Sequence, residues 1–404
     1  MSKIKYIIKK EVKRQKETIN LIPSENFVSK DVLYALGSPL TNKYSEGYPS
    51  KRYYPGNIYY DELERYVQSL ALKAFRLNPK KWAVNVQPYS GSPANLAVYL
   101  ALMNPGEKLI GFSLTSGGHL THGHSASYSG KLFNVMQYSV DPNTGKINYE
   151  NLEKLAVKFK PKIIVSGITS YPRKLNFKKF YKISKRVNAF HVADIAHIAG
   201  LVLAKLHPSP FPYADVVTMT THKTLRGPRG ALIFMRKELE EKINKSVFPG
   251  LQGGPHNNVI AAIGIMFEEA LRKNFINYQR QIVKNAKKLA HELIKKGFKL
   301  YTNGTDNHLM VIDLKNIGID GKTAEKILES ANIIANRNSL PGDTSPFNPS
   351  GLRLGTPAIT TRKMREKDMP KIADFIYRLL IKKENPIKVK KEVLKFIKKF
   401  PLNY

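Results

Sequence analysis

Residues 215–230 read DVVTMTTHKTLRGPRG, a β-branched strand pattern that runs into a lysine and then into a Gly-Pro-Arg-Gly turn. Similar short β-branched runs recur along the middle of the chain and alternate with helical patterns. The strands expected from these runs cover residues 108–113, 134–140, 162–169, 189–194, 215–220 and 231–236. The helical stretches that alternate with them lie at 93–103, 149–159 and 177–187. This alternation predicts an α/β fold with a mostly parallel, doubly wound sheet.

The pattern changes after Gly253-Gly254-Pro255, where two long helices are expected, the second of them amphipathic. The elements expected beyond that point are helices at 256–272 and 275–296, a strand at 308–314, a helix at 322–330, a Pro/Gly/Ser-rich loop at 339–351 and a Lys-rich helical C-terminus. We therefore expect an N-terminal helical segment over residues 1–20, a large domain over 21–274 and a smaller α+β domain over 275–404.

The composition narrows the class of protein. The 404 residues are 42% hydrophobic and 24% charged, and they include no Cys, which excludes disulfides, thiolate metal sites and a Cys nucleophile. No apolar run reaches the roughly 18 residues of a membrane span. The basic N-terminus places Ile4, Ile7 and Ile8 on one helical face and lacks the apolar run of an export signal. A soluble, cytoplasmic protein without a membrane partner is expected.

The net charge is +35, from 66 basic and 31 acidic residues, a balance that in a small domain would indicate nucleic-acid binding. The excess is spread along the chain, so a nucleic-acid partner is not expected. Absence of Cys together with heavy use of Lys and Ile is typical of hyperthermophile proteins, whose Lys-rich surfaces need no polyanion. The composition therefore predicts a thermostable protein.

Lys223 stands apart from the other lysines because it follows a buried-looking strand and is flanked by small hydroxylated residues. Loss of solvation lowers the pKa of a lysine and lets it form a Schiff base with an aldehyde. The plain alternative is an ordinary loop lysine after a strand.

Two further features make the aldehyde of pyridoxal phosphate the better interpretation. Asp194 ends the preceding strand, and a carboxylate there could keep a pyridinium ring protonated, although a helix N-cap is its commonest alternative role. Ser90-Gly91-Ser92 opens an apolar helix, whose first N–H groups suit a phosphate, although ordinary capping also uses these residues. Phosphate cup, Asp and Lys in this order predict a pyridoxal-phosphate site.

Ordered motifs along nearly the whole chain resemble the serine hydroxymethyltransferase family in its archaeal form, pyridoxal-phosphate enzymes of the aspartate-aminotransferase fold. They are residues 21–26 (LIPSEN), 42–49 (NKYSEGYP), 51–54 (KRYY), 117–123 (GGHLTHG), 194–197 (DIAH), 221–225 (THKTL), 248–250 (FPG), 252–255 (QGGP) and 353–357 (RLGTP).

The resemblance implies the residues around the cofactor. Lys223 would bind its aldehyde, Asp194 would pair with the ring nitrogen and His119 would stack on the ring. Glu46 would transfer protons, and His197 and Thr220 complete the implied catalytic group. The remaining implied cofactor contacts are Ser90, Gly91, Ser92, Thr169, His222, Tyr44, Tyr54, Gly253 and Gly254. A homodimer with shared sites is implied, in which Gly253, Gly254 and Tyr44 or Tyr54 come from the partner subunit.

The resemblance also implies the substrates: L-serine and a reduced pterin, converted reversibly to glycine and the methylene-pterin. Arg353 would clamp the amino-acid carboxylate, helped by Ser24 and His197. The other implied substrate or pterin contacts are Glu46, Tyr54, Leu114, Gly118, His119, Leu120, Asn338, Ser345, Pro346 and Phe347. The pterin is tetrahydrofolate or tetrahydromethanopterin, and the hyperthermophile-like composition and Arg226 favour the second slightly.

Three positions depart from the family pattern. Pro23 and Arg226 replace small residues, and residues 169–171 (TSY) are a variant of a Ser-containing strand end. Arg226 could contact a cofactor phosphate or an anionic pterin tail, or be one more surface cation.

Three other functions would each use part of the same set of residues. A metal site built on His191, Asp194 and His197 is not expected, because on a strand an odd spacing turns the Asp away from both His. A basic scaffold on a retired enzyme fold is disfavoured because Lys223, Asp194, Glu46 and Arg353 are all present. The alternative enzyme is a pterin-independent aldolase that cleaves 3-hydroxy amino acids such as threonine.

Overall fold

The computed structural model describes residues 2–343 and 348–402, which form two compact units. The large unit comprises Val28–Thr169 and Lys174–Gln279, and the small unit comprises the residues up to Phe27, Ser170–Arg173 and those from Arg280 on. This division falls near the boundaries expected at residues 20 and 274, but it groups residues 21–27 with the C-terminal part. Strand β1 (Ile19–Asn20) explains this grouping, because it pairs in parallel with β13 (Ile333–Ile334).

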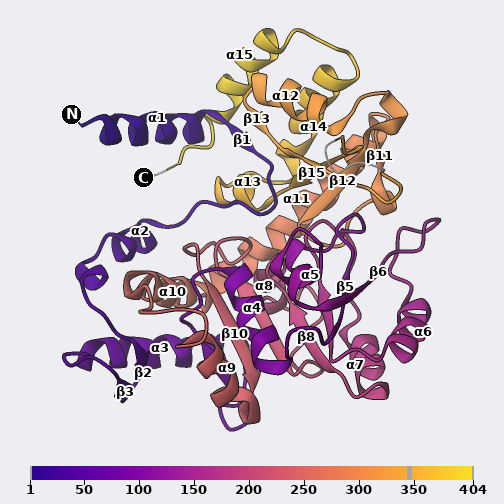
Figure 1. The fold of residues 1–404 in the computed structure, drawn as a ribbon. Helices are drawn as coiled ribbons and strands as arrows, with labels where there is room; N and C mark the ends of the chain where they lie inside the picture. The colour runs from indigo at the N-terminus through magenta and orange to yellow at the C-terminus, as the bar shows by residue number, and fades with distance from the viewer. Residues whose placement is uncertain (1, 344–347, 403–404) are drawn as a thin grey trace. The chain divides into compact units, whose positions relative to one another are not determined.

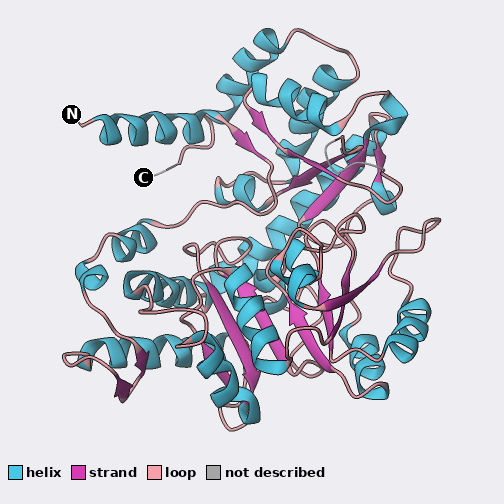
Figure 2. Ribbon diagram, viewed as in Figure 1, coloured by secondary structure: helices cyan, strands magenta, loops and turns pink. Residues whose placement is uncertain are grey.

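The large unit is built on a seven-stranded sheet with the order β4-β10-β9-β8-β7-β5-β6 (Figures 1 and 2). The strands are β4 (Trp82–Asn85), β5 (Lys108–Phe112), β6 (Asn134–Tyr138), β7 (Ile163–Gly167), β8 (Phe190–Asp194), β9 (Val216–Thr220) and β10 (Ala231–Arg236). Strand β10 runs antiparallel to both of its neighbours, β4 and β9, and the other neighbouring strands pair in parallel. The expected mostly parallel α/β sheet is thus confirmed.

Helices cover both faces of this sheet. They are α2 (Lys30–Leu36), α3 (Ile58–Ala74), α4 (Gly91–Leu102), α5 (Tyr128–Leu132), α6 (Tyr149–Phe159), α7 (Phe177–Arg186), α8 (Ala199–Leu203), α9 (Glu240–Val247) and α10 (Asn257–Ala270). Helix α4 packs in one apolar cluster with Val192 of β8, whereas Phe180 of α7 stacks on the ring of the adjacent residue, His191. Since successive strand residues point to opposite faces, α4 and α7 lie on opposite sides of β8.

The small unit contains a four-stranded antiparallel sheet with the order β11-β12-β15-β14. Its strands are β11 (Lys299–Leu300), β12 (Leu309–Asp313), β14 (Asn336–Asn338) and β15 (Gly351–Gly355). Its helices are α1 (Lys3–Glu17), α12 (Gly321–Ser330), α13 (Pro357–Thr361), α14 (Met369–Leu380) and α15 (Pro386–Ile397), and α11 (Lys273–Lys295) contains the division between the units. One apolar core joins the sheet to α12, α14 and α15.

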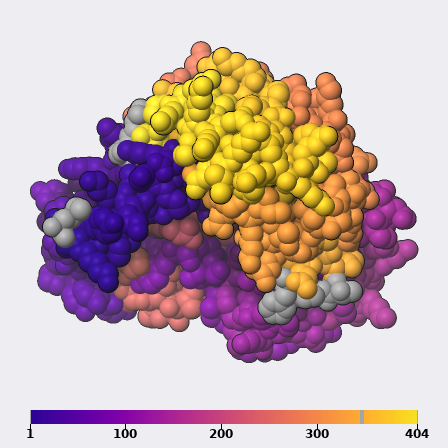
Figure 3. Space-filling view, turned by 90° about the horizontal axis from the view of Figure 1, so that it is seen from above, coloured from indigo at the N-terminus to yellow at the C-terminus, as the bar shows by residue number. Residues whose placement is uncertain are grey.

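Helices α1 and α15, far apart in the sequence, lie side by side in the small unit (Figure 3). The buried Arg362 holds them there by donating to backbone carbonyls at the C-terminal ends of both helices. The acceptors are Gln15 and Lys16 in the last turn of α1, Thr18 just after it, Ile397 at the end of α15, and Phe400 beyond it. Helix C-termini carry partial negative charge, so they suit a buried guanidinium.

Within the described residues, no helix has the length and apolarity required to cross a bilayer.

Candidate active site

Lys223 lies in a loop that begins where β9 ends, and it is buried with 9% of its surface exposed. Hydrogen bonds fix the backbone on both sides of it. Thr221 Oγ1 donates to the Pro228 carbonyl (2.6 Å), and the carbonyl of Thr224 accepts from Gln279 Nε2 (2.6 Å). Thr224 Oγ1 donates to the carbonyl of His197 (3.1 Å), which ties this loop to the end of β8. The lysine is therefore presented from a rigid, buried loop.

Asp194 ends β8 and is in register with Thr218 of β9, as expected for neighbouring parallel strands. Its Oδ2 accepts from Asn95 Nδ2 (3.0 Å) and lies 3.1 Å from His122 Nε2, and its Oδ1 accepts from the Ala196 N–H (2.9 Å). Burial alone would raise the pKa of Asp194, but the hydrogen bond and charge of His122, followed by His119 and Asn95, hold the pKa well below its usual value. The carboxylate is thus ionised and fixed in place.

The expected phosphate cup is the first turn of α4. Ser90 occupies the N-cap with an extended backbone and uses no side-chain capping bond, which leaves its hydroxyl and the first N–H groups of the helix for another partner. A Cβ on Gly91 would lie 2.8 Å from the methyl group of Thr220, so a larger residue would close this space.

His222 supplies an independent sign of an anionic ligand. Its Nδ1 is buried and has no hydrogen-bond partner among the described residues. Burial, with help from the charges of Lys223 and Arg229, lowers the pKa of His222 to about 3. Buried unpaired polar atoms are costly, and this one lies two residues after Thr220, which borders the cup. The first turn of α4 and His222 fit a phosphate group, and the nearby Lys223 and Asp194 fit the aldehyde and the ring nitrogen of pyridoxal phosphate.

The structure also places the other residues implied for the cofactor. His119 caps the 3-10 turn Leu120–His122, with its Nδ1 2.8 Å from Thr121 Oγ1. Thr169 donates its N–H to the Gly117 carbonyl (2.7 Å), and the Thr220 hydroxyl donates to the carbonyl of Ala196 (3.2 Å). His197 is buried beside the lysine loop, through its carbonyl bond with Thr224.

Tyr44, Tyr54, Glu46, Gly253 and Gly254 form a second cluster within the large unit. The two tyrosine rings lie 5.4 Å apart. A Cβ on Gly254 would lie 3.1 Å from the Tyr44 ring, and one on Gly253 would lie 3.3 Å from Glu46 Oε1. Tyr44 and Tyr54 are 60% and 44% exposed, an unusual state for two neighbouring aromatic rings.

Of the residues implied for the substrate carboxylate, Arg353 and Ser24 belong to the small unit and His197 to the large one. Arg353 lies on β15, almost fully buried, and donates from Nε to Asn336 Oδ1 (3.2 Å). Burial lowers the pKa of Arg353 to about 10, which keeps the guanidinium charged at neutral pH. Ser24 directly follows Pro23, and a Cβ added to Gly355 of β15 would lie 2.3 Å from the Pro23 side chain. Pro23, one of the departures, thus packs against the strand that carries Arg353.

The residues implied for the pterin are distributed over both units. Leu114, Gly118 and Leu120 belong to the loop after β5, where a Cβ on Gly118 would lie 2.0 Å from the Phe112 carbonyl oxygen. Asn338 ends β14 and donates to the Ser339 carbonyl (2.6 Å). Ser345, Pro346 and Phe347 lie outside the described residues.

Arg226 lies beside a carboxylate and an aromatic ring of the large unit. Its guanidinium lies 3.5 Å from Glu269 and 5.0 Å from the centre of the Tyr278 ring, on α10 and α11. Its Nε is buried and has no hydrogen-bond partner among the described residues. The interpretation of Arg226 as a contact for a phosphate or a pterin tail stays a prediction.

Comparison with known proteins decides the family. A sequence model described as "Serine hydroxymethyltransferase" matches residues 2–376. The chain belongs to the serine hydroxymethyltransferase family. Proteins of that name from Caenorhabditis elegans and Caenorhabditis briggsae are each 50% identical over 390 residues, 92% of this chain and 77% and 76% of theirs. "Serine hydroxymethyltransferase, mitochondrial" from Schizosaccharomyces pombe is 50% identical over 411 residues, 96% of this chain and 84% of its own length.

These serine hydroxymethyltransferases come from two nematodes and a fission yeast, so the comparisons do not support the archaeal form that we expected. Family membership confirms that the chain is a one-carbon transferase dependent on pyridoxal phosphate rather than a retired scaffold. Within the described residues, no group of three or more His, Cys, Asp and Glu side chains could hold a metal ion.

Sequence reasoning did not single out Asn95 and His122, which hold Asp194. Asn95 is the polar residue within the apolar first half of α4, and it also accepts from Thr218 Oγ1 (2.7 Å). A buried amide inside an apolar helix is the signal that could have indicated a partner.

Proposed function

We propose that this chain transfers the hydroxymethyl group of L-serine to a reduced pterin, reversibly, to give glycine and the methylene-pterin, with pyridoxal phosphate as its cofactor. The observation that carries the proposal is 50% identity over 92% of the chain with relatives named serine hydroxymethyltransferase. The ionised, buried Asp194 and the buried Lys223 at neighbouring strand ends support it.

The residues of the large unit would hold the cofactor. When bound, pyridoxal phosphate supplies an aldehyde for covalent attachment and a ring that withdraws electrons from the substrate. Lys223 provides the amine, and Asp194 keeps a proton on the ring nitrogen. Ser90, the first N–H groups of α4 and Nδ1 of His222 bind the phosphate. His119 would contact the ring of the cofactor.

Two charged residues act on the substrates. Arg353 binds the carboxylate of serine through two parallel N–H donors. Glu46 moves a proton between the serine hydroxyl and the pterin, which both a retro-aldol route and a direct displacement require.

The acceptor pterin is tetrahydromethanopterin or tetrahydrofolate. The slight preference for tetrahydromethanopterin rests on the composition and on Arg226, which lies 3.5 Å from Glu269. Steady-state serine cleavage with each pterin at high temperature tests it. A markedly higher kcat/KM with tetrahydrofolate would overturn the preference.

We also propose a cytoplasmic homodimer with shared active sites and, within each subunit, the three-part division at residues 20 and 274. The exposed Tyr44 and Tyr54 beside Gly254 support a surface that a second subunit completes.

Hybrid dimers test the shared site. Lys223→Ala and Glu46→Gln chains are each expected to be inactive in pterin-dependent serine cleavage. If Glu46, like its neighbour Tyr44, enters the site from the partner subunit, a mixed dimer contains one site in which both residues are intact. An equimolar mixture of subunits should therefore recover about a quarter of the wild-type activity, since half of the dimers are mixed. Activity is measured in the mixture after the subunits have exchanged and again in the purified tagged hybrids, which should show about half of the wild-type activity. No recovery, or a fully active monomer in sedimentation, would contradict sharing.

Arg353→Ala is expected to weaken serine binding by about 2–3 kcal/mol, roughly 30- to 150-fold, because the carboxylate loses a charged bidentate partner. Titration calorimetry of the cofactor-loaded enzyme measures the serine affinity. Arg337→Ala is the control, since Arg337 is exposed on the neighbouring strand β14. Unchanged affinity in Arg353→Ala would make Arg353 structural.

The aldolase alternative predicts cleavage that is independent of pterin. It is favoured if Glu46→Gln slows pterin-dependent serine cleavage and the cleavage of bulkier 3-hydroxy amino acids equally.

A further inference from the structure

Glu46 directly precedes a tight hairpin formed by β2 (Gly47–Tyr48) and β3 (Lys51–Arg52). Gly47 has φ +91°, and a Cβ there would lie 2.2 Å from the Lys51 carbonyl oxygen, so the turn requires glycine. The Glu46 carbonyl accepts from the N–H of Tyr53 (3.0 Å). The backbone at Glu46 is therefore set by the hairpin.

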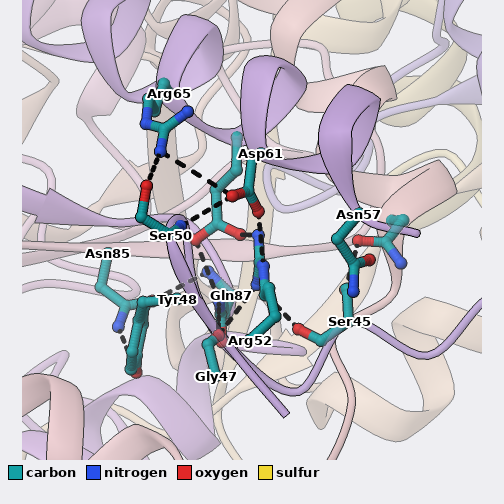
Figure 4. A network of polar contacts seen from close by, with 12 residues as sticks. Ser45, Gly47, Tyr48, Ser50, Arg52, Asn57, Asp61, Arg65, Asn85 and Gln87 are labelled. Carbon is teal, nitrogen blue, oxygen red and sulfur yellow. Dashed lines mark hydrogen bonds and ion pairs between the residues drawn. The ribbon is translucent and has the colours of Figure 1, made fainter. Parts of the chain in front are cut away.

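Arg52 holds the two carbonyls that flank Glu46. Its Nη1 donates to the carbonyls of Ser45 (2.7 Å) and Gly47 (2.9 Å). Its Nε and Nη2 bind carboxylates of α3, at 2.8 Å from Asp61 and 2.6 Å from Glu64. Figure 4 shows Arg52 and Gln87 converging on Gly47.

Glu64 and Gln87 are buried residues that also help to hold the backbone beside Glu46. Gln87 Nε2 donates both to the Gly47 carbonyl (3.0 Å) and to Glu64 Oε1 (2.9 Å). The Glu64 side chain is 2% exposed. Burial raises the pKa of Glu64, and the charge of Arg52 opposes that rise. The Gln87 carbonyl also accepts from Gln252 Nε2 (2.9 Å), next to Gly253, which borders Glu46.

A buried ion pair of this kind is a weak source of stability, because well-packed apolar residues often replace such a pair without loss. The hydrogen bonds of Arg52 and Gln87 instead hold the carbonyls of the residues before and after Glu46, Ser45 and Gly47. We propose that Glu64 and Gln87 are positioning residues that fix the carboxylate of Glu46 for proton transfer. This inference rests on the proposed function, in which Glu46 transfers the proton.

The test compares two reactions of the cofactor-loaded enzyme. Glu64→Gln is expected to lower kcat for pterin-dependent serine cleavage about tenfold or more, because small displacements of a reacting group are costly, with KM for serine changed less than about twofold. Pterin-independent cleavage of a bulky 3-hydroxy amino acid, which does not need Glu46, should change less than about twofold. Glu62→Gln, on the exposed side of α3, is the matched control and should change neither reaction.

Gln87→Met provides a second variant that keeps the Arg52–Glu64 pair, and it should show the same split between the reactions. Neither substitution should slow a Glu46→Gln enzyme further, since both act through Glu46. Equal losses in the two reactions, or an additive loss in the Glu46→Gln background, would overturn this inference and leave the proposed function standing. If Glu46→Gln itself leaves pterin-dependent cleavage intact, the proposed role of Glu46 fails and the inference falls with it.

Discussion

Lys223→Ala is expected to remove all covalently bound pyridoxal phosphate and to lower serine cleavage by roughly 10⁴-fold or more, as loss of a covalent catalyst does. The variant should remain folded, because the bonds that hold the loop come from Thr221, Thr224 and Gln279. Borohydride reduction followed by peptide mass spectrometry locates the covalent adduct, and circular dichroism reports the fold.

Lys242→Ala is a matched control, since Lys242 is an exposed lysine on α9 of the same unit. It should retain both the adduct and the activity. A stoichiometric adduct on another lysine in Lys223→Ala would end the assignment of Lys223.

Asp194→Ala and Asp194→Asn are expected to weaken cofactor binding and to reduce turnover by roughly a thousandfold, the scale of a buried charge partner worth about 4 kcal/mol. Asn nearly preserves the shape but carries no charge, so the ring nitrogen would no longer hold its proton. Because the pKa of Asp194 is depressed in the fold, its carboxylate is ionised throughout the neutral range, and the wild-type pH profile should show no titration of this group there.

Equilibrium dialysis gives the cofactor affinity of these variants, and single-turnover kinetics at saturating cofactor gives the rate of cleavage. The two measurements separate loss of binding from loss of chemistry. Near-normal turnover at saturation in Asp194→Ala would mean that another residue holds the ring nitrogen.

Local sequence was sufficient for the centre of the site. Lys223 follows a β-branched strand, Asp194 ends the neighbouring apolar strand, and the parallel pairing of β8 with β9 brings the two strand ends together as expected. The direction of β10 was not foreseen. Ten residues separate it from β9, fewer than the dozen or more that a parallel crossover needs, which indicates an antiparallel neighbour.

The supports of the site were less visible because their partners are remote in sequence. Asn95 binds Asp194 across 99 positions, and Gln87 reaches the Gly47 carbonyl across 40. The spacing of hydrophobic residues within one helix or strand gives no information about contacts between residues so far apart in the sequence. The association of β1 with β13 was missed for a similar reason, since two-residue strands carry no alternation.

The most direct test of the proposed function follows the β-carbon of L-serine, labelled with carbon-13, in the presence of the enzyme, pyridoxal phosphate and a reduced pterin. We predict that the label appears in the methylene-pterin at the same rate as glycine forms, and that both products depend on the pterin. Glycine formation that is unaffected by the pterin, with the label released as free formaldehyde, would contradict hydroxymethyl transfer and indicate an aldolase.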